Sequence, residues 1–189
     1  MAFFTAASKG DFQQQLQAAL AQHVDESLLP QVRRFAEQFF GIVALSELTE
    51  RRMSDLVGST LASWRLLERF DPAAPKVQVF NPDYEKHGWQ STHSVLEVLH
   101  PDMPFLVDSV RMELTRRGYS IHTLQNSVLQ VRRDTEGGLL ELLKEWRPQV
   151  IRPMEIGQYG LVHRARHVVA AARAGGAVPD VREGSGIEV

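Results

Sequence analysis

The chain has 189 residues, of which 43% are hydrophobic and 23% charged, which suits one globular domain or one domain with a helical appendage. Its formal net charge of -2 argues against a dedicated nucleic-acid-binding protein, and no apolar run approaches the roughly 20 residues of a membrane-spanning helix. The absence of cysteine excludes a disulfide framework, a thiolate metal site and a cysteine nucleophile. Since the first residues also lack a secretory signal, we expect a cytoplasmic protein that binds neither nucleic acid nor a membrane.

Residues 1–71 predict a helical segment, because apolar residues recur there at helical spacing. We expect a first helix over about 8–23 and a second that starts near Leu28, with Pro30 in its first turn. Short helical turns should begin at Ser46 and Thr49, and a longer helix should cover about 54–70. The second helix carries a bulky stripe that we interpret as core packing rather than a cofactor site: Val32, Phe35, Ala36, Phe39 and Phe40. Gly58, in the last helix, is expected to let another backbone approach closely.

A stiff connector, Asp71–Pro75, follows the helices, and we place a domain boundary there. Residues 76–80 (KVQVF) alternate polar and apolar side chains, which predicts a half-exposed strand. Residues 84–91 read as a polar loop.

The best-specified structure is a strand–helix–strand unit over residues 89–131. Its first strand covers Val95–Leu99, and the helix that follows has Asp102 as its candidate N-cap and Pro104 in its first turn. Gly118 suits the left-handed stop after this helix. The next extended piece includes Ile121 and 128–131, followed by a hairpin turn over 132–138 and a returning strand over 139–143.

The last segment, 146–189, differs in composition from the rest, since it holds six arginines and no lysine and is rich in alanine and glycine. A helix over about Leu161–Ala174 is expected within it. The predicted organisation is therefore a helical segment (1–71), an α/β domain (76–145) and a divergent tail (146–189).

No catalytic constellation and no metal site emerge from the sequence. His87, His93, His100 and His122 fall on different elements without paired ligand spacing, so we interpret them as solvated or hydrogen-bonded side chains. Neither a dinucleotide nor a triphosphate glycine motif is present, so we expect no cofactor in this segment.

The turn between the strand and the helix, His100–Pro104, supports one modest functional hypothesis. Free N–H groups at a helix N-terminus favour an anionic ligand such as an amino-acid carboxylate, although simple capping by Asp102 is the alternative. The candidate effector-binding residues are His100, Asp102, Met103, Asp108 and Ser109.

The block of residues 80–134 closely resembles the N-terminal region of the large bacterial NAD-specific glutamate dehydrogenases. The specific motifs are GWQS, MPFLVDSV and ELxRRG followed by IH, and the likeness covers roughly residues 1–143. It implies an α+β fold in which a helical N-terminal segment precedes an ACT-like domain, a ferredoxin-like βαββαβ sandwich. ACT-type modules commonly bind amino acids or assemble subunits.

The resemblance also implies a function. The family oxidatively deaminates L-glutamate to 2-oxoglutarate with NAD, and its catalytic lysine and Rossmann domain lie downstream of this region. The segment is thus expected to be non-catalytic, with other subunits or the downstream catalytic region as partners and an amino acid as effector. A free-standing amino-acid-binding module is the alternative, and an independent enzyme is a third hypothesis.

The likeness ends after Leu143. The following residues are either a divergent remainder of the ACT-like domain or a foreign or truncated end. In the second case the domain would be incomplete at its C-terminal end, and its sheet would expose an edge.

Overall fold

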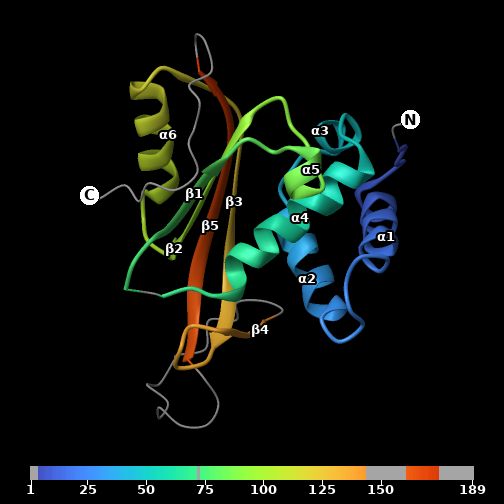
Figure 1. Ribbon diagram of the computed structural model, residues 1–189, viewed down its shortest axis with the longest axis horizontal. Coiled ribbons are helices and arrows are strands. Elements are labelled where there is room, and N and C mark those ends of the chain that lie inside the picture. Colours follow the sequence, from blue (N-terminus) through green and yellow to red (C-terminus); the bar gives the residue numbers. More distant parts are fainter. Residues whose placement is uncertain (1–3, 72, 144–160, 175–189) are drawn as a thin grey trace.

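The protein consists of an antiparallel sheet with helices on both of its faces. A computed structural model describes residues 4–71, 73–143 and 161–174 (Figure 1). The helices before the sheet, together with the short α5 (Tyr84–His87), lie on one side of it, and α6 lies on the other side. None of the helices in these ranges combines the length and hydropathy needed to cross a bilayer.

The first layer contains the helices predicted for the N-terminal segment. They are α1 (Lys9–Leu20), α2 (Leu29–Phe39), α3 (Leu45–Thr49) and α4 (Met53–Glu68). Ser8 caps α1, because its Oγ accepts a hydrogen bond from the backbone N–H of Asp11 at 3.1 Å. Pro30 lies in the first turn of α2, where a missing N–H costs no helical hydrogen bond.

The core lies between this layer and the sheet. The predicted apolar stripe of α2 is buried, and its rings pack against other rings: Phe35 and Phe39 stack with centroids 5.1 Å apart, and Phe12 and Phe40 meet edge to face at 5.7 Å. The same cluster continues into the sheet through Leu99, Leu129, Val131 and Leu142. The interpretation of the stripe as core packing is therefore confirmed.

Within the described residues, the sheet has five strands in the order β1-β2-β5-β3-β4, and all neighbouring strands are antiparallel. The strands are β1 (Lys76–Phe80), β2 (Ser94–Pro101), β3 (Tyr119–Arg133), β4 (Leu139–Leu142) and β5 (Leu161–Ala174). Since β2 and β3 both run antiparallel to β5, they run parallel to each other and are joined by α6 (Leu106–Arg116). This is a split β-α-β unit, which confirms the strand–helix–strand prediction.

Residues 161–174 form the central strand β5, so the helix predicted there is wrong. Residues 165–172 of β5 lie between two strands; Ala170, for example, pairs with Leu96 of β2 and with Leu124 of β3. Backbone pairing on both sides outweighs the helix propensity of the alanine-rich sequence. Part of the segment predicted as a tail thus lies at the centre of the sheet.

The start of α6 also differs from the prediction. The helix begins at Leu106, and its N-cap is Phe105, in a left-handed conformation with φ of 63°, rather than Asp102. Strand β2 continues to Pro101, so residues 102–105 are needed to turn the chain out of the sheet, and Pro104 precedes the helix. The predicted stop at Gly118 is confirmed, since its φ of 79° is one that glycine adopts without strain.

The hairpin between β3 and β4 is closed by an aspartate and a buried arginine. Asp134 Oδ1 accepts hydrogen bonds from the N–H groups of Glu136 and Gly138, both at 2.8 Å. Arg133 donates from Nη1 to the carbonyl of Gly137 at 3.0 Å and lies 5.5 Å from the Phe70 ring centroid. Burial lowers the pKa of Arg133 to about 10. The helical layer and the hairpin are thus tied together through Phe70.

Candidate functional site

The predicted effector residues lie around the start of α6. His100 Nδ1 lies 2.8 Å from the carbonyl oxygen of Pro101, and Asp102 is half-buried. Met103, Asp108 and Ser109 are exposed. No side chain caps the helix at Phe105, although the backbone carbonyl of Phe105 accepts the Ser109 N–H at 2.9 Å. These residues share one end of the helix, and none of them lines the cleft described next.

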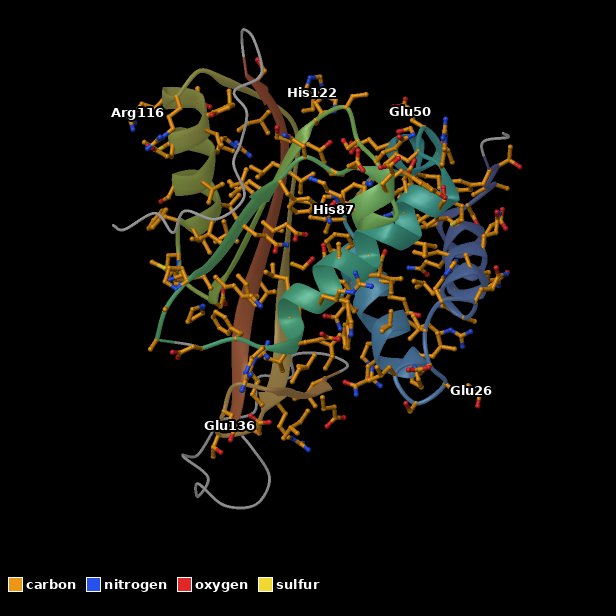
Figure 2. The ribbon with its side chains drawn as sticks, viewed as in Figure 1. Glu26, Glu50, His87, Arg116, His122 and Glu136 are labelled. Atoms are coloured by element: carbon orange, nitrogen blue, oxygen red, sulfur yellow. The ribbon has the colours of Figure 1, made fainter. Side chains whose placement is uncertain are left out.

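A cleft of about 920 Å³ lies between the helical layer and the sheet, a volume within the range of small-molecule sites. We call it the interlayer cleft. Its lining comes from the helical layer between Phe39 and Ser63, from residues 82–83 and 89–93, and from β2 and β3. Glu50 and His122, labelled in Figure 2, belong to its lining from opposite layers.

Polar side chains are buried on the walls of this cleft. Ser59 and Ser63 of α4, Glu97 of β2 and Gln125 of β3 are each at most 6% exposed. Glu97 accepts hydrogen bonds from Ser63 Oγ and from Gln78 Nε2, while Gln125 Nε2 donates to the carbonyl of Phe39 at 3.3 Å. The carboxylate of Glu97 is therefore fixed in place by both layers.

Arg51 supplies a guanidinium to the same cleft. Its Nη2 donates to Ser59 Oγ at 3.3 Å. Burial lowers the pKa of Arg51 from its ordinary value, and the nearby carboxylate of Asp55 opposes that shift. Arginine stays charged at neutral pH despite such a shift, so the cleft contains a poorly hydrated cation.

Trp89 closes the cleft beside α4. Its ring lies directly over Gly58, where an added Cβ would come within 2.5 Å of Trp89 Cβ. The expected close approach at Gly58 is thus made by a side chain rather than by another backbone. The Trp89 indole is 3% exposed, and its Nε1–H has no hydrogen-bond acceptor among the described residues.

The histidines considered for a metal site are spread over this half of the molecule. His87 Nδ1 accepts the Asp83 N–H at 3.0 Å, and the His93 and His122 rings lie 4.1 Å apart, centroid to centroid. In the described ranges, no group of three or more histidine, aspartate or glutamate side chains is arranged to hold a metal ion.

Sequence reasoning missed the cleft and the residues that line it. Two signals were available, and the first is Glu97, which interrupts the apolar run VLEVL, where a buried carboxylate requires polar partners. The second was the group of small polar residues on the buried side of α4, including Ser59 and Ser63. Neither signal identifies its partner across the two layers.

The comparison with known protein families bears on this geometry. The family described as "Glutamate dehydrogenase, ACT1 domain" matches residues 35–156, which is more than half of the chain. The chain belongs to this family. The resemblance seen in the sequence is therefore confirmed, and the α+β fold contains an ACT-like domain preceded by helices.

Two curated relatives of this ACT1 family member are named NAD-specific glutamate dehydrogenase. The protein from Pseudomonas aeruginosa is 65% identical over 163 residues, which cover 86% of this chain and 10% of that protein. The protein from Halomonas elongata is 52% identical over 126 residues, which cover 67% of this chain and 8% of that protein. The chain thus spans about a tenth of the length of these relatives. No solved structure matches it.

The matched range of the ACT1 family includes the whole lining of the interlayer cleft, from Phe39 to Gln125. The range also crosses the connector 71–75. The cleft therefore belongs to the part of the chain that the family match covers.

Proposed function

We propose that this chain is the N-terminal, non-catalytic part of a large NAD-dependent glutamate dehydrogenase, and that it serves subunit assembly and regulation in the cytoplasm. The complete enzyme would deaminate L-glutamate to 2-oxoglutarate, with NAD bound by a downstream region. The relatives' names and their roughly tenfold greater length support this proposal.

The proposed assembly role is supported by an exposed apolar surface on the α6 side of the sheet. No residue of α6 is buried, and Phe105 and Met112 are 78% and 71% exposed. We call this surface the α6 face. Residues of this kind are normally covered in a soluble protein when they gather on one side.

The exposed valines of the sheet belong to the same face. Gln78 of β1 donates to the Glu97 carboxylate of β2, which also accepts from Ser63 of the helical layer. Ser127 of β3 donates to the carbonyl of Gln38 in α2, so Gln78 and Ser127 both lie on the side of the helical layer. Because side chains alternate along a strand, Val77, Val79 and Val128 point to the opposite side, where α6 lies. We propose that another region of the same enzyme packs on the α6 face.

The start of α6 is proposed as an effector site on the same face. The backbone N–H groups at this helix start, which the Phe105 side chain does not cap, would bind a carboxylate, and the acidic side chains of Asp102 and Asp108 would attract an ammonium group. His100, Met103 and Ser109 complete this proposed site.

Substitution of Met112 by aspartate in the complete enzyme tests the assembly role. A charge on the α6 face should weaken subunit or domain contacts, so mass photometry should show a smaller oligomer or a looser particle. Ala18→Asp, at an exposed position of α1 on the other side of the sheet, is the control and should leave the assembly unchanged. Unchanged assembly in Met112→Asp would contradict the proposal.

The non-catalytic role is tested on the 189-residue chain. With L-glutamate and NAD, the purified chain should form no NADH, because hydride transfer requires a dinucleotide site. Glutamate-dependent NADH formation would support the independent enzyme instead.

A further inference from the structure

We propose that the interlayer cleft receives a lysine- or arginine-bearing peptide segment from the part of the enzyme that follows this chain. A main-chain carbonyl of the segment would accept a hydrogen bond from the Trp89 indole, and its cationic side chain would lie at the carboxylates of Glu47 and Glu50. The source of the segment rests on the proposed function, whereas the recognition chemistry does not. The cleft is separate from the α6 face.

The formal charge of the cleft is the first observation. Two arginines line it, together with five acidic side chains, which are Glu47, Glu50, Asp55, Asp83 and Glu97. This formal excess of three negative charges exceeds the net charge of -2 of the whole chain, so the acidity of the molecule is concentrated at the cleft. A concave site of one sign attracts ligands of the opposite sign. The cleft therefore favours a cation and disfavours a free carboxylate.

Two exposed glutamates contribute to this excess without a partner. Glu47 lies in α3, and Glu50, labelled in Figure 2, directly follows that helix. In the part of the chain that the structure describes, neither carboxylate has a hydrogen bond or an ion pair. By contrast, Asp55 accepts the Gln90 N–H at 3.2 Å, and Asp83 caps α5. The carboxylates of Glu47 and Glu50 are thus available to a cation from outside.

Trp89 supplies a second, independent observation. Its side chain is 3% exposed, and its Nε1–H has no acceptor among the described residues. A buried indole N–H usually finds an acceptor. Because Trp89 lines the cleft, a ligand atom there can accept this hydrogen bond. An uncharged oxygen suits this role best, since a carboxylate would be repelled by the acidic lining.

A peptide segment combines the two properties that these observations require. Its main-chain carbonyls are uncharged acceptors, and a lysine or arginine side chain carries the positive charge on a flexible stem. A polyamine has the charge but no acceptor oxygen, and a free amino acid brings a carboxylate. The cleft volume of about 920 Å³ is near the upper end of the range for small-molecule sites, which leaves room for more than one residue of a peptide.

The remainder of the enzyme is the source that we infer for this segment. The chain covers 10% and 8% of the two curated relatives, so most of the peptide surface of such an enzyme lies outside the matched region. One exposed ion pair and one hydrogen bond are each weak. A tethered segment can use weak contacts because its effective concentration is high.

Titration of the 189-residue chain with N-acetyl-alanyl-lysyl-alanine amide tests the recognition chemistry. In proton–nitrogen NMR spectra, the Trp89 indole resonance, assigned by its absence in Trp89→Phe, should move downfield because the N–H gains an acceptor. The glutamine analogue, which lacks the charge, should bind about fivefold or more weakly, and so should free L-lysine. Equal binding of the glutamine analogue, tighter binding of free lysine, or an unmoved Trp89 resonance would overturn the proposal.

Matched double variants locate the cation. Glu47→Gln with Glu50→Gln should weaken binding of the lysine peptide about fivefold or more. The control, Glu26→Gln with Glu85→Gln, changes the net charge equally at exposed positions outside the cleft and should bind like the parent chain (Figure 2 labels Glu26). Unchanged binding in the cleft variant, or the same loss in both variants, would rule out a cation at Glu47 and Glu50.

The complete enzyme tests the source of the segment. A fluorescent form of the lysine peptide should bind it about tenfold or more weakly than it binds the 189-residue chain, because the tethered segment already occupies the cleft. Equal binding to both, measured by anisotropy, would refute a downstream source. The result is independent of Met112→Asp: unchanged assembly in that variant would contradict the assembly role of the α6 face and leave the peptide site standing.

Discussion

Gly58 shows how one missing side chain shapes the wall of the interlayer cleft. An added Cβ at this position would meet Cβ and Cγ of Trp89 at 2.5 and 2.8 Å, closer than carbon atoms pack. The indole is therefore seated against the helix backbone, and residues on both sides of the connector 71–75 depend on each other. The sequence predicted that something approaches closely here, but not which group, since Trp89 lies 31 positions further along the chain (89 minus 58).

Gly58→Ala should destabilise the protein. Overpacking of this kind costs about 1–3 kcal/mol, which exceeds the roughly 1 kcal/mol that alanine gains over glycine in a helix. Urea unfolding would measure the loss. Gly10→Ala is the matched control, because its Cβ would meet its nearest atom, Ser8 Oγ, at 3.7 Å; it should be neutral or stabilise slightly. Equal stability of the two variants would contradict the packing at Trp89.

The candidate site illustrates what a sequence can say about single residues. The group at the start of α6 could be found because strand end, turn and helix are contiguous from His100 to Ser109. The interlayer cleft could not be found from the sequence, because Arg51, Trp89 and Glu97 come together only when the two layers pack. Glu97 is recognisable as unusual within its apolar run, but its partner Ser63 lies in another element.

The elements themselves were predictable wherever their stabilisation is local. β1 has the predicted bounds, and α4 begins within one residue of its expected start. The start of α6 and the nature of residues 161–174 were wrong for one shared reason. The length of β2 fixes where α6 begins, and pairing with β2 and β3 makes β5 a strand; both are properties of the sheet rather than of the local sequence.

Ala170→Pro tests the central place of β5. Proline cannot donate a backbone hydrogen bond, and Ala170 pairs with a neighbour on each side, so the substitution should disrupt the sheet and lower the far-UV strand signal. Thr135→Pro is the control, since the exposed Thr135 lies in the β3–β4 turn, where proline is tolerated. A native spectrum for Ala170→Pro would exclude a central strand at this position.

At the scale of the whole molecule, the helices and the sheet share one core. Phe12, Phe35 and Trp64 belong to the same buried cluster as Leu99 and Leu142. Helix α2 is also hydrogen-bonded to β4: Gln31 Oε1 accepts from the Leu142 N–H at 3.1 Å, and Arg34 donates to the Leu142 carbonyl. The boundary predicted at 71–75 thus lies between elements that bury each other's apolar surface.

We expect the chain to unfold in one step. In urea, tryptophan fluorescence and the far-UV helix signal should follow the same transition, because a shared core makes unfolding cooperative. A chain that starts at residue 72 should lack a cooperative transition, since the inner face of its sheet would lose its cover. Two separate transitions, or a stably folded shortened chain, would instead support independent domains on the two sides of the connector.

The position of β5 has a consequence for synthesis on the ribosome. β2 and β3 are translated long before β5, so both leave the exit tunnel with the facing edges that β5 later pairs still open. The N-terminal helices, which are made first, are available to shelter one side of these strands in the meantime. The speed at which codons 134–160 are read therefore sets how long the two strand edges stay open. During that time they can pair with nascent chains on other ribosomes of the same mRNA.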